Sequence, residues 1–581
     1  MKQMKTNHLL NKMIFQIAFG LIMVEIAGAI TYMIDGIVTS RFLDATAMAA
    51  SGVAVPVYSV LTIISGVLAT GFQNIAGKQV GEGDIEKARN TWETTWRFAL
   101  IISCIITLAG IFFSDGIATL LGAPVSASKL HTDSSELIKG YMIGTVPYIL
   151  IALFVPALQF NGNNKLITIS IVAMTVADVV GDLLNVYLFN GGVFGMGLAT
   201  SLSYFISAAI LMTGLLNKNT LMRISIRSHI SKEKGTLLSI INRGLPKATK
   251  RACNSLRSII VNRLIVATAG EIAMVAMSVE CTIRYIPESI GVGLSGAALM
   301  LVGIFLGEMD YHSLKEMQKT YRALIGVGVT LLSVIYFIAS DFLTQLYITP
   351  GSPSYQLTVN ILRCHAVSLP FLAYNECRLS CLQAMGKMLV THILTVIQRI
   401  VCIIGLSYFL GFFFGVDGIW YAIPLSEVIV AVIIAFCSKV VIPSRKKNEP
   451  DVIGDFSESL TEINQIPNFL DRVDDFLKRY DIDKQKSYYV YLFCEEISNL
   501  VLQKGFNDKK AHHLDIRVIY TENEITVRTR DDCLNLSDIE KYDKCPDAPD
   551  DSLLGFHMVF KLAKKVEYID TMNLNHLIIR L

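Results

Sequence analysis

Charged side chains are scarce in this chain of 581 residues. Asp, Glu, Lys and Arg make up 17% of it, whereas a soluble globular protein carries about 25%. Apolar residues make up 52%, and the mean hydropathy is +0.49. This composition excludes an ordinary soluble fold for most of the chain and indicates a protein that sits in the lipid bilayer.

Signatures of metal proteins and ATP-driven pumps are missing as well. Cys377 and Cys381 have no matching Cys or His pair nearby, so we expect no metal site. No G-x-x-x-x-G-K-[ST] sequence occurs, which disfavours an ATP-driven pump. The basic N-terminal stretch lacks a following cleavage site of small residues, so it is predicted to lead into an uncleaved first span. We expect no catalytic residue, no required cofactor and no nucleic-acid partner.

The charge that is present divides the chain in two. Residues 1–450 carry 34 Lys and Arg against 24 Asp and Glu, whereas residues 451–581 carry 17 against 25. This asymmetry predicts a basic, apolar membrane body followed by an acidic, soluble tail. The predicted divisions are an N-terminal six-helix bundle at 1–235, a C-terminal six-helix bundle at 236–442, a linker at 443–451 and a soluble domain at 452–581.

The membrane body contains twelve apolar segments that are long enough to cross about 30 Å of hydrocarbon, which takes about 20 helical residues. They lie near 13–39, 47–76, 91–113, 137–160, 166–190, 195–217, 243–269, 272–305, 321–340, 355–384, 388–412 and 418–442. Lys and Arg gather in alternate loops and at both ends of the body, as they do on the cytoplasmic side of membranes. We therefore expect an all-α polytopic protein of the cell (plasma) membrane with twelve transmembrane helices and both termini cytoplasmic.

The two predicted bundles repeat one another. Residues 81–92 are echoed by 307–321, 161–166 by 385–389, and 193–203 by 414–427, at offsets near 220–226 residues. An even number of spans in each repeat returns the chain to the same side, so the halves are parallel and related by an axis along the membrane normal. Transporters built in this way bind near the midplane and rock between two open states.

Three carboxylates lie inside the predicted spans. Asp35 falls in the first span, and Asp178 and Asp182 fall in the fifth. A carboxylate at bilayer depth costs roughly 2.5–3.5 kcal/mol, so it persists mainly where it lines a polar cavity or an ion path. We expect these residues to couple the movement of an ion to transport.

The spacing of these acids bears on which ion they bind. Asp178 and Asp182 lie one helical turn apart on one face, and Asn185 is within reach of that face. Two neighbouring carboxylates do not both ionise cheaply, which favours proton exchange, whereas a bound Na⁺ would keep them ionised. The coupling ion is therefore H⁺ or Na⁺, with H⁺ favoured. A purely structural role, in which the acids hydrogen-bond neighbouring helices, is the alternative.

The second half has a polar cluster of its own. Glu280, Arg284 and Glu288 follow one another at four-residue steps in the predicted eighth span, so they share one helix face. They form either a self-neutralising structural ladder or a contact for substrate or ion. Arg399 and Glu427 are expected to pair across two helices, as structural residues.

Several motifs of the membrane body resemble one transporter family. The stretches 33–60, 71–91 and 182–203, and INRGLPKATKRACNS at 241–255, strongly resemble the multidrug and toxic compound extrusion (MATE) family. The resemblance covers roughly residues 10–442. It implies secondary active efflux of organic, cationic or amphipathic compounds, with H⁺ or Na⁺ moving inward.

The resemblance also implies an ion site. In one prokaryotic branch of the family, that site uses an Asp late in the first span, with an Asn and an Asp four residues apart in the fifth. The matching positions here are Asp35, Asp178 and Asp182, so an Asp replaces the Asn. Gly20 stands where the family often has a proline that bends the first span.

The tail shows helix-like patterns at 461–480, 487–505 and 553–566, with alternating strand-like runs between and after the last two. This predicts a cytoplasmic α+β domain of about 130 residues. It resembles the ATP-binding domain of anti-sigma-factor serine kinases, in the histidine-kinase-like ATPase superfamily. The carrying residues are Glu495 and Asn499, which in that family activate the attacking hydroxyl and hold Mg²⁺ respectively.

The glycine boxes of that ATPase family are only partly retained. Asp531 matches the adenine-binding box, but Cys533 and Asn535 replace both of its glycines. Gly555 is the one retained glycine of the phosphate-binding loop. Glycines let the backbone approach phosphates closely, so the tail either binds ATP and Mg²⁺ or is a regulatory domain for a cytoplasmic protein partner.

Three functions are compatible with these features. The leading hypothesis is an ion-coupled exporter of small molecules with a cytoplasmic regulatory domain, which is not an enzyme. A flippase for lipid-linked precursors is the second, and a membrane-tethered serine kinase or sensor is the third. Twelve repeated spans with buried acids exceed what a membrane anchor needs, which disfavours the third.

Overall fold

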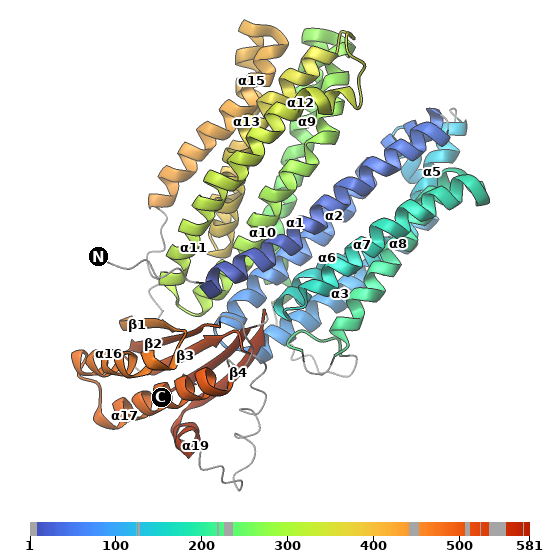
Figure 1. Cartoon of the computed structure of the whole chain (residues 1–581). Coiled ribbons are helices and arrows are strands. Elements are labelled where there is room, and N and C mark those ends of the chain that lie inside the picture. The colour runs from blue at the N-terminus through green and yellow to red at the C-terminus, as the bar shows by residue number, and fades with distance from the viewer. Residues whose placement is uncertain are drawn as a thin grey trace.

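Two groups of long helices and a small sheet make up the computed structural model (Figure 1). The structure describes residues 8–43, 45–123, 125, 128–217, 220–225, 236–440, 452–505, 512–522, 524–533, 554–572 and 574–581. The predicted linker at 443–451 lies outside the described residues.

The N-terminal group is built from eight described helices, and some neighbouring helices, such as the bent pair α5 and α6, can count as one span. They are α1 (His8–Phe42), α2 (Ala45–Gly81), α3 (Ile85–Phe112), α4 (Ser114–Leu120), α5 (Ser128–Ile143), α6 (Thr145–Phe160), α7 (Asn164–Leu184) with the π-helical segment η1 (Asn185–Phe189), and α8 (Gly192–Leu215). The chain bends by 45° between α5 and α6.

The C-terminal group follows the same plan. Its helices are α9 (Thr236–Ile283), α10 (Tyr285–Gly307), α11 (Tyr311–Ala323) with η2 (Leu324–Val329), α12 (Thr330–Gln345), α13 (Tyr355–Ala384), α14 (Met388–Val396) with η3 (Ile397–Cys402), and α15 (Ile403–Val440). Gly270 in α9 and Gly415 in α15 have positive φ angles of 67° and 60°, so each of these helices turns sharply at its glycine.

The repeat in the sequence has a counterpart in the helix caps. Asp84 caps α3 by accepting a hydrogen bond from the Lys87 amide at 3.2 Å. Asp310 caps α11 by accepting one from the Ser313 amide at 2.8 Å. An Asp in this position satisfies an amide that a helix leaves unpaired, and both halves use it at the same place in the repeat.

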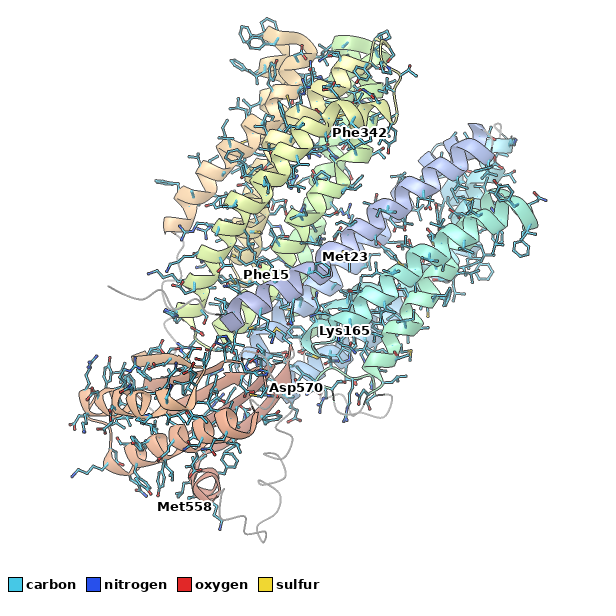
Figure 2. All side chains as sticks on the ribbon, in the orientation of Figure 1. Phe15, Met23, Lys165, Phe342, Met558 and Asp570 are labelled. Carbon is cyan, nitrogen blue, oxygen red and sulfur yellow. The ribbon has the colours of Figure 1, made fainter. Side chains whose placement is uncertain are left out.

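Apolar surface covers the helical body. Within the described residues, eight helices are long and apolar enough to cross a membrane, or up to nine if the bent pair α5–α6 counts as one span. Large apolar side chains point outward along them, such as Phe15 at 55% exposure and Phe342 at 64% (Figure 2). A soluble protein rarely exposes so much apolar surface, whereas lipid solvates it.

The tail contains a five-stranded antiparallel sheet in the order β1-β2-β3-β5-β4. The strands are β1 (Val452–Leu460), β2 (Leu514–Thr521), β3 (Ile525–Asp531), β4 (Lys565–Thr571) and β5 (Leu574–Arg580). The helical elements are η4 (Ile463–Gln465), α16 (Ile466–Arg479), α17 (Lys484–Leu500) with η5 (Val501–Gly505), and α19 (Leu554–Leu562). The sequence patterns did not predict β1.

The helices of the tail cover one face of its sheet. Side chains alternate between the two faces of a strand, and Ile516, Val527 and Ile579 form a buried core with Phe469 of α16 and Phe493 of α17. The opposite face of the sheet lies against the ends of the membrane helices (Figure 1).

Candidate functional site

Asp35, Asp178 and Asp182, here called the acid cluster, lie on two helices of the N-terminal half that pack together, α1 and α7. Asp178 and Asp182 are fully buried, and Asp35 is half-buried. The carboxyl group of Asp35 is close enough to interact with those of both other acids. Two distant parts of the sequence thus supply one polar site inside an apolar bundle.

No basic residue balances the acid cluster in the described part of the chain, where none of its three members forms an ion pair. Both oxygens of Asp178, both of Asp182 and Oδ1 of Asp35 also lack a hydrogen-bond partner there. A buried carboxylate without a partner is unfavourable. The acid cluster therefore gains most from a proton or a small cation.

Hydroxyl groups line one side of the acid cluster. Thr200 and Ser203 of α8 lie beside Asp178. Their own hydroxyl protons are directed to the main chain, to Met196 O at 3.2 Å and to Thr200 O at 2.8 Å respectively. Their oxygens are therefore left as acceptors, which suits a protonated acid or a bound cation.

Asn185 has a different environment from the three acids. It begins the π-helical segment η1, and its side-chain amide donates to the Gly192 carbonyl at 2.9 Å. It thereby fixes the turn between α7 and α8. A π-helical segment after Asp182 shifts the face of the helix, which residue spacing alone does not reveal.

Four tyrosines from four helices form an aromatic group near the acid cluster that the sequence patterns did not reveal. The hydroxyls of Tyr58 and Tyr204 are 3.0 Å apart. The ring of Tyr148 lies 5.4 Å from that of Tyr58 and 5.2 Å from that of Tyr204, and Tyr141 is 6.5 Å from Tyr58. Tyr58 and Tyr141 are within electrostatic range of Asp35. Aromatic faces attract organic cations.

The polar residues of the C-terminal half are compensated. Glu280, fully buried, forms an ion pair with Arg284 at 3.5 Å (Nη1–Oε2) and faces His365 at 3.4 Å (Oε1–Nδ1). His365 also faces Glu288 at 3.7 Å (Nε2–Oε1). Glu280 and Glu288 lie on either side of Arg284, the residue at which α9 gives way to α10. His365 of α13 thus lies between both acids of the predicted cluster.

A second set of ion pairs lies deeper in this half. Glu376 pairs with Lys250 at 2.6 Å and with Arg399. Glu427 accepts hydrogen bonds at 2.8 Å from Asn375 and from Gln398. The expected pair of Arg399 with Glu427 is therefore wrong, because Glu376 takes the guanidinium and two amides satisfy Glu427.

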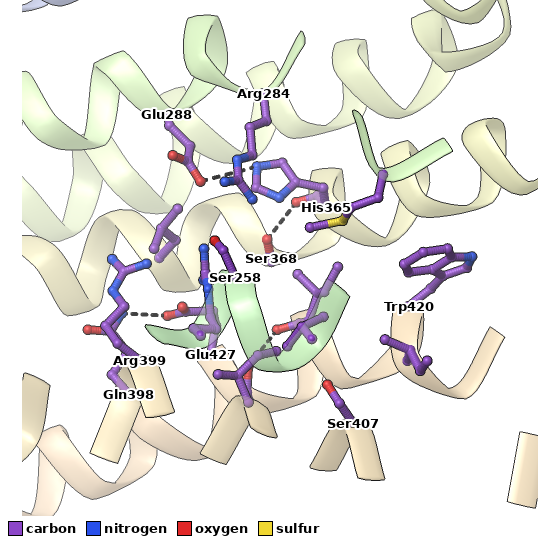
Figure 3. Close-up of a pocket in the computed structure, with 18 residues that line it drawn as sticks. Ser258, Arg284, Glu288, His365, Ser368, Gln398, Arg399, Ser407, Trp420 and Glu427 are labelled. Carbon is purple, nitrogen blue, oxygen red and sulfur yellow. Dashed lines mark hydrogen bonds and ion pairs between the residues drawn. The ribbon is translucent and has the colours of Figure 1, made fainter. Parts of the chain in front are cut away.

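Several polar groups of the C-terminal half border a small cavity (Figure 3). Its volume is about 50 Å³, room for one or two water molecules at about 30 Å³ each. Glu288, His365, Arg399 and Glu427 line one side, and Trp420 lies at the other. The charged and polar side chains on this lining can bind water or a small ion.

The predicted nucleotide residues of the tail are only partly brought together. Glu495 and Asn499 lie one turn apart on α17, and Gly555 lies in the first turn of α19. Asp531 is buried in β3, where its carboxylate accepts from the Asn575 amide at 2.8 Å and from the main chain of Cys533 at 3.1 Å. Burial raises the pKa of Asp531.

Asn535 and the stretch 534–553 lie outside the described residues. Within the described residues, no group of three or more His, Cys, Asp or Glu side chains is arranged to hold a metal ion.

Comparison with known proteins places the membrane body in a family. The family model MatE matches residues 21–184 and 246–409, one stretch in each half. The multidrug export protein MepA of Staphylococcus saprophyticus is 22% identical over 414 residues, which cover 70% of this chain and 89% of MepA. The uncharacterized transporter YisQ of Bacillus subtilis is 23% identical over 404 residues, covering 68% of this chain and 86% of its own.

Solved structures share the fold. A multidrug resistance MATE transporter in an outward-facing conformation has a TM-score of 0.69 at 19% identity, covering 76% of this chain and 99% of that one. A MOP superfamily transporter from Pyrococcus furiosus, whose reversed pocket polarity suggests a different function, has a TM-score of 0.66 at 20% identity, with the same coverage. The chain is a multi-pass membrane protein and belongs to the MatE family, the multidrug and toxic compound extrusion transporters.

Proposed function

We propose that this protein is a secondary active exporter of organic, cationic or amphipathic compounds, driven by the inward movement of H⁺ or Na⁺. The observation that carries the proposal is the acid cluster, whose buried carboxylates have no basic partner among the described residues. Membership of a transporter family agrees with it, and makes the chain a transporter rather than an enzyme.

Protons are the favoured coupling ion. A bound Na⁺ would keep neighbouring buried carboxylates ionised, which is unfavourable. Two adjacent carboxylates instead share a proton readily. Asp35 on α1 and Asp178 and Asp182 on α7 are the groups that we assign to ion coupling, while Asn185 keeps the helix turn beside them in place.

The aromatic group is the proposed contact for the organic substrate. Tyr58, Tyr141, Tyr148 and Tyr204 supply ring faces that attract a positive charge, next to acids that do the same when ionised. A proton that neutralises the acid cluster would weaken the hold on a cationic substrate. That linkage couples uptake of the ion to release of the substrate.

We assign a supporting role to the C-terminal half. Arg284, Glu288 and His365 border the small cavity. Glu280 pairs with Arg284 and faces His365, so opposite charges lie beside one another in this cluster. Such a network frames the substrate path and supplies water or an ion site, while the N-terminal half handles the driving ion.

The proposed topology has twelve spans in the cell (plasma) membrane, in bundles at 1–235 and 236–442, with both termini cytoplasmic. The sharp turns at Gly270 and Gly415 support it, because each divides one long helix, α9 or α15, into two spans. The Lys and Arg of alternate loops support the orientation.

The region 452–581 is proposed to be a cytoplasmic regulatory domain. Its resemblance to an ATP-binding domain makes Glu495, Asn499, Asp531 and Gly555 the candidates for ATP and Mg²⁺. The alternative is a domain that binds a cytoplasmic protein. Membership of the MatE family favours the exporter over both the lipid-precursor flippase and the tethered kinase.

The transport proposal is tested in proteoliposomes with an imposed pH or Na⁺ gradient. Wild type exports a cationic dye under the coupling gradient, and Asp182→Asn does not. Asp115→Asn, at an exposed position on α4, is the matched control and exports normally. Normal export by Asp182→Asn under both gradients would show that the assigned coupling site is wrong.

The tail is tested by calorimetric titration of the full chain with ATP and Mg²⁺. A heat of binding that wild type shows and Asn499→Ala does not show supports a nucleotide site on α17. No heat at millimolar nucleotide leaves the binding of a protein partner as the surviving role.

A further inference from the structure

The tail sheet turns a row of arginines toward the membrane body. Arg517 of β2, Arg528 and Arg530 of β3 and Arg580 of β5 lie on the face opposite its own helices. Arg517 is 7% exposed and Arg528 is 9% exposed, although both side chains are charged. Buried arginines need partners. Asp455 of β1 supplies one to Arg517 at 2.7 Å within the tail, and the membrane helices supply further partners to all four arginines.

The arginines bind the turn between α10 and α11 in the C-terminal half. Arg530 forms an ion pair with Glu308 at 2.6 Å. Arg517 donates to the carbonyl of Met309 at 2.9 Å and lies 3.8 Å from the carboxylate of Asp310. The nearby Arg517 lowers the pKa of Asp310 against the opposing effect of burial, so the turn carries its negative charges where the sheet meets it.

The same face of the sheet binds the N-terminal half. Arg528 donates to the carbonyl of Gly81 at 2.7 Å, and Arg580 to that of Glu82 at 2.7 Å. At the end of α6, the carbonyl of Phe160 accepts from the Thr571 hydroxyl at 2.7 Å and from the Met572 amide at 3.1 Å. One rigid sheet is therefore bonded to both halves.

The two turns that the tail sheet contacts occupy equivalent positions in the sequence repeat. Residues 81–84 (GEGD) follow α2, and residues 307–310 (GEMD) follow α10. A Cβ on Gly81 would lie 2.0 Å from the Ile304 carbonyl, and one on Gly307 would lie 2.2 Å from the Lys78 carbonyl. The ends of α2 and α10 therefore touch, backbone against backbone, directly beside the sheet.

The halves touch near the sheet and separate away from it. Further close approaches join the halves at Gly71 with Ile240 and at Gly77 with Met300. By contrast, Gly52 near the other end of α2 has nothing within 4 Å. Figure 1 shows the two groups of helices diverging with distance from the sheet.

We propose that the tail sheet is a clasp that joins the two equivalent turns, 81–84 and 307–310, and keeps the membrane body closed on its own side. In the proposed orientation that side is the cytoplasmic one, and this consequence rests on the proposed function. The two turns separate when a transporter of this plan opens there. The sheet must therefore release at least one half in each cycle, and whatever binds the tail controls that release.

The clasp is tested by pulsed electron spin resonance on the full chain in lipid nanodiscs, in a background without native cysteines. Spin labels at Lys165→Cys and Lys387→Cys, at the equivalent exposed starts of α7 and α14 outside the clasp, report the separation of the halves. A second pair, Lys165→Cys with Lys484→Cys, reports whether the sheet is docked. Figure 2 shows where Lys165 lies at the end of the body that faces the sheet.

Wild type is expected to show one short distance for each pair. Arg530→Glu places a negative charge against Glu308, so both pairs gain a longer population. The double variant Arg530→Glu with Glu308→Arg restores the ion pair and the short distances. Arg479→Glu, the same change at an exposed site on α16, leaves both distances unchanged.

Two results would overturn the proposal. In one, Arg530→Glu undocks the sheet while the distance between the halves stays short. In the other, the sheet stays docked even in Arg528→Glu with Arg530→Glu, which would show that these arginines do not hold it. The measurement needs neither substrate nor gradient, so its failure is separate from a failure of the transport proposal.

Discussion

The two halves of the membrane body share a helix plan and differ in how they treat charge. In the N-terminal half, the acids of α1 and α7 have no basic partner within the described residues. In the C-terminal half, Glu376 has two cations, and Glu427 has two amide donors. The two halves thus share one scaffold, but within the described residues the acids of α1 and α7 lack the charged or amide partners that Glu376 and Glu427 have.

Equivalent helical segments of the two halves carry different polar residues. Helix α7 carries Asp178 and Asp182, whereas the equivalent segment η3 carries Gln398 and Arg399. The carboxylates of Asp178 and Asp182 have no partner among the described residues, whereas the guanidinium of Arg399 pairs with Glu376 within the folded protein. Removal of an acid from the N-terminal half should therefore impair transport. Removal of a paired acid from the C-terminal half should lower the stability of the fold.

The largest expected effect is on transport. Asp178→Asn with Asp182→Asn should abolish gradient-driven dye export, because no ionisable pair remains on α7. Glu288→Gln, at the edge of the compensated network, should leave export coupled to the gradient. Proteoliposome flux measures both variants. Coupled export by the double Asp variant, with loss in Glu288→Gln, would reverse the assignment of the two halves.

The next effect is on stability. Glu376→Gln leaves Lys250 and Arg399 without their carboxylate, and breaking a buried ion pair costs about 3–5 kcal/mol. Asp182→Asn removes an acid that has no partner, so its unfolding temperature should not fall. Thermal unfolding in detergent, followed by tryptophan fluorescence, compares them. Equal unfolding temperatures for both variants and wild type would remove the contrast.

Packing is where the halves should agree. Gly81→Ala and Gly307→Ala each push a methyl group into a carbonyl of the other half, and overpacking costs about 1–3 kcal/mol. Their losses in unfolding free energy should be similar, because the two sites are related by the repeat. Gly28→Ala, with nothing within 4 Å, is the control and should lose nothing. Unequal losses would mean that the symmetry at these turns is only apparent.

The smallest expected effect is a pH dependence of sheet docking. Burial, with Arg530 and Arg528 nearby, lowers the pKa of His576 well below its ordinary 6.5. The facing carboxylate of Glu308 is 3.8 Å away (Oε1–Nδ1) and does not offset this. Protonation therefore favours the undocked sheet, so the contribution of His576 to docking is full above about pH 6.5 and declines as the pH falls below it.

The docking distance from Lys165 to Lys484 measures this dependence between about pH 7.5 and pH 5.5, where an unperturbed His titrates. Wild type should gain an undocked fraction toward the acidic end. His576→Gln should show none of that change. A wild-type distance that is constant over this range would contradict the prediction.

Sequence patterns predicted the helical membrane body, because hydropathy acts over long segments. They also singled out Asp35, Asp178 and Asp182, which the structure brings together, while their role in ion coupling stays a prediction. They missed β1, whose acidic residues lie on an edge strand with weak alternation. They mispaired Arg399, because the partner of a buried cation depends on which helices pack together. They also missed the tyrosine group, since its four members lie on four helices and meet only in the fold.

The contacts between the tail and the membrane body join distant parts of the sequence: Lys12 pairs with Asp532 at 2.7 Å across 520 residues. The tail emerges from the ribosome after both halves have entered the membrane, and domains fold in the order of synthesis. Its sheet has a complete docking surface only when both halves stand side by side with their turns aligned. Docking therefore follows the alignment of both halves, and a misassembled body would leave the arginines of the sheet without the partners that the two turns supply.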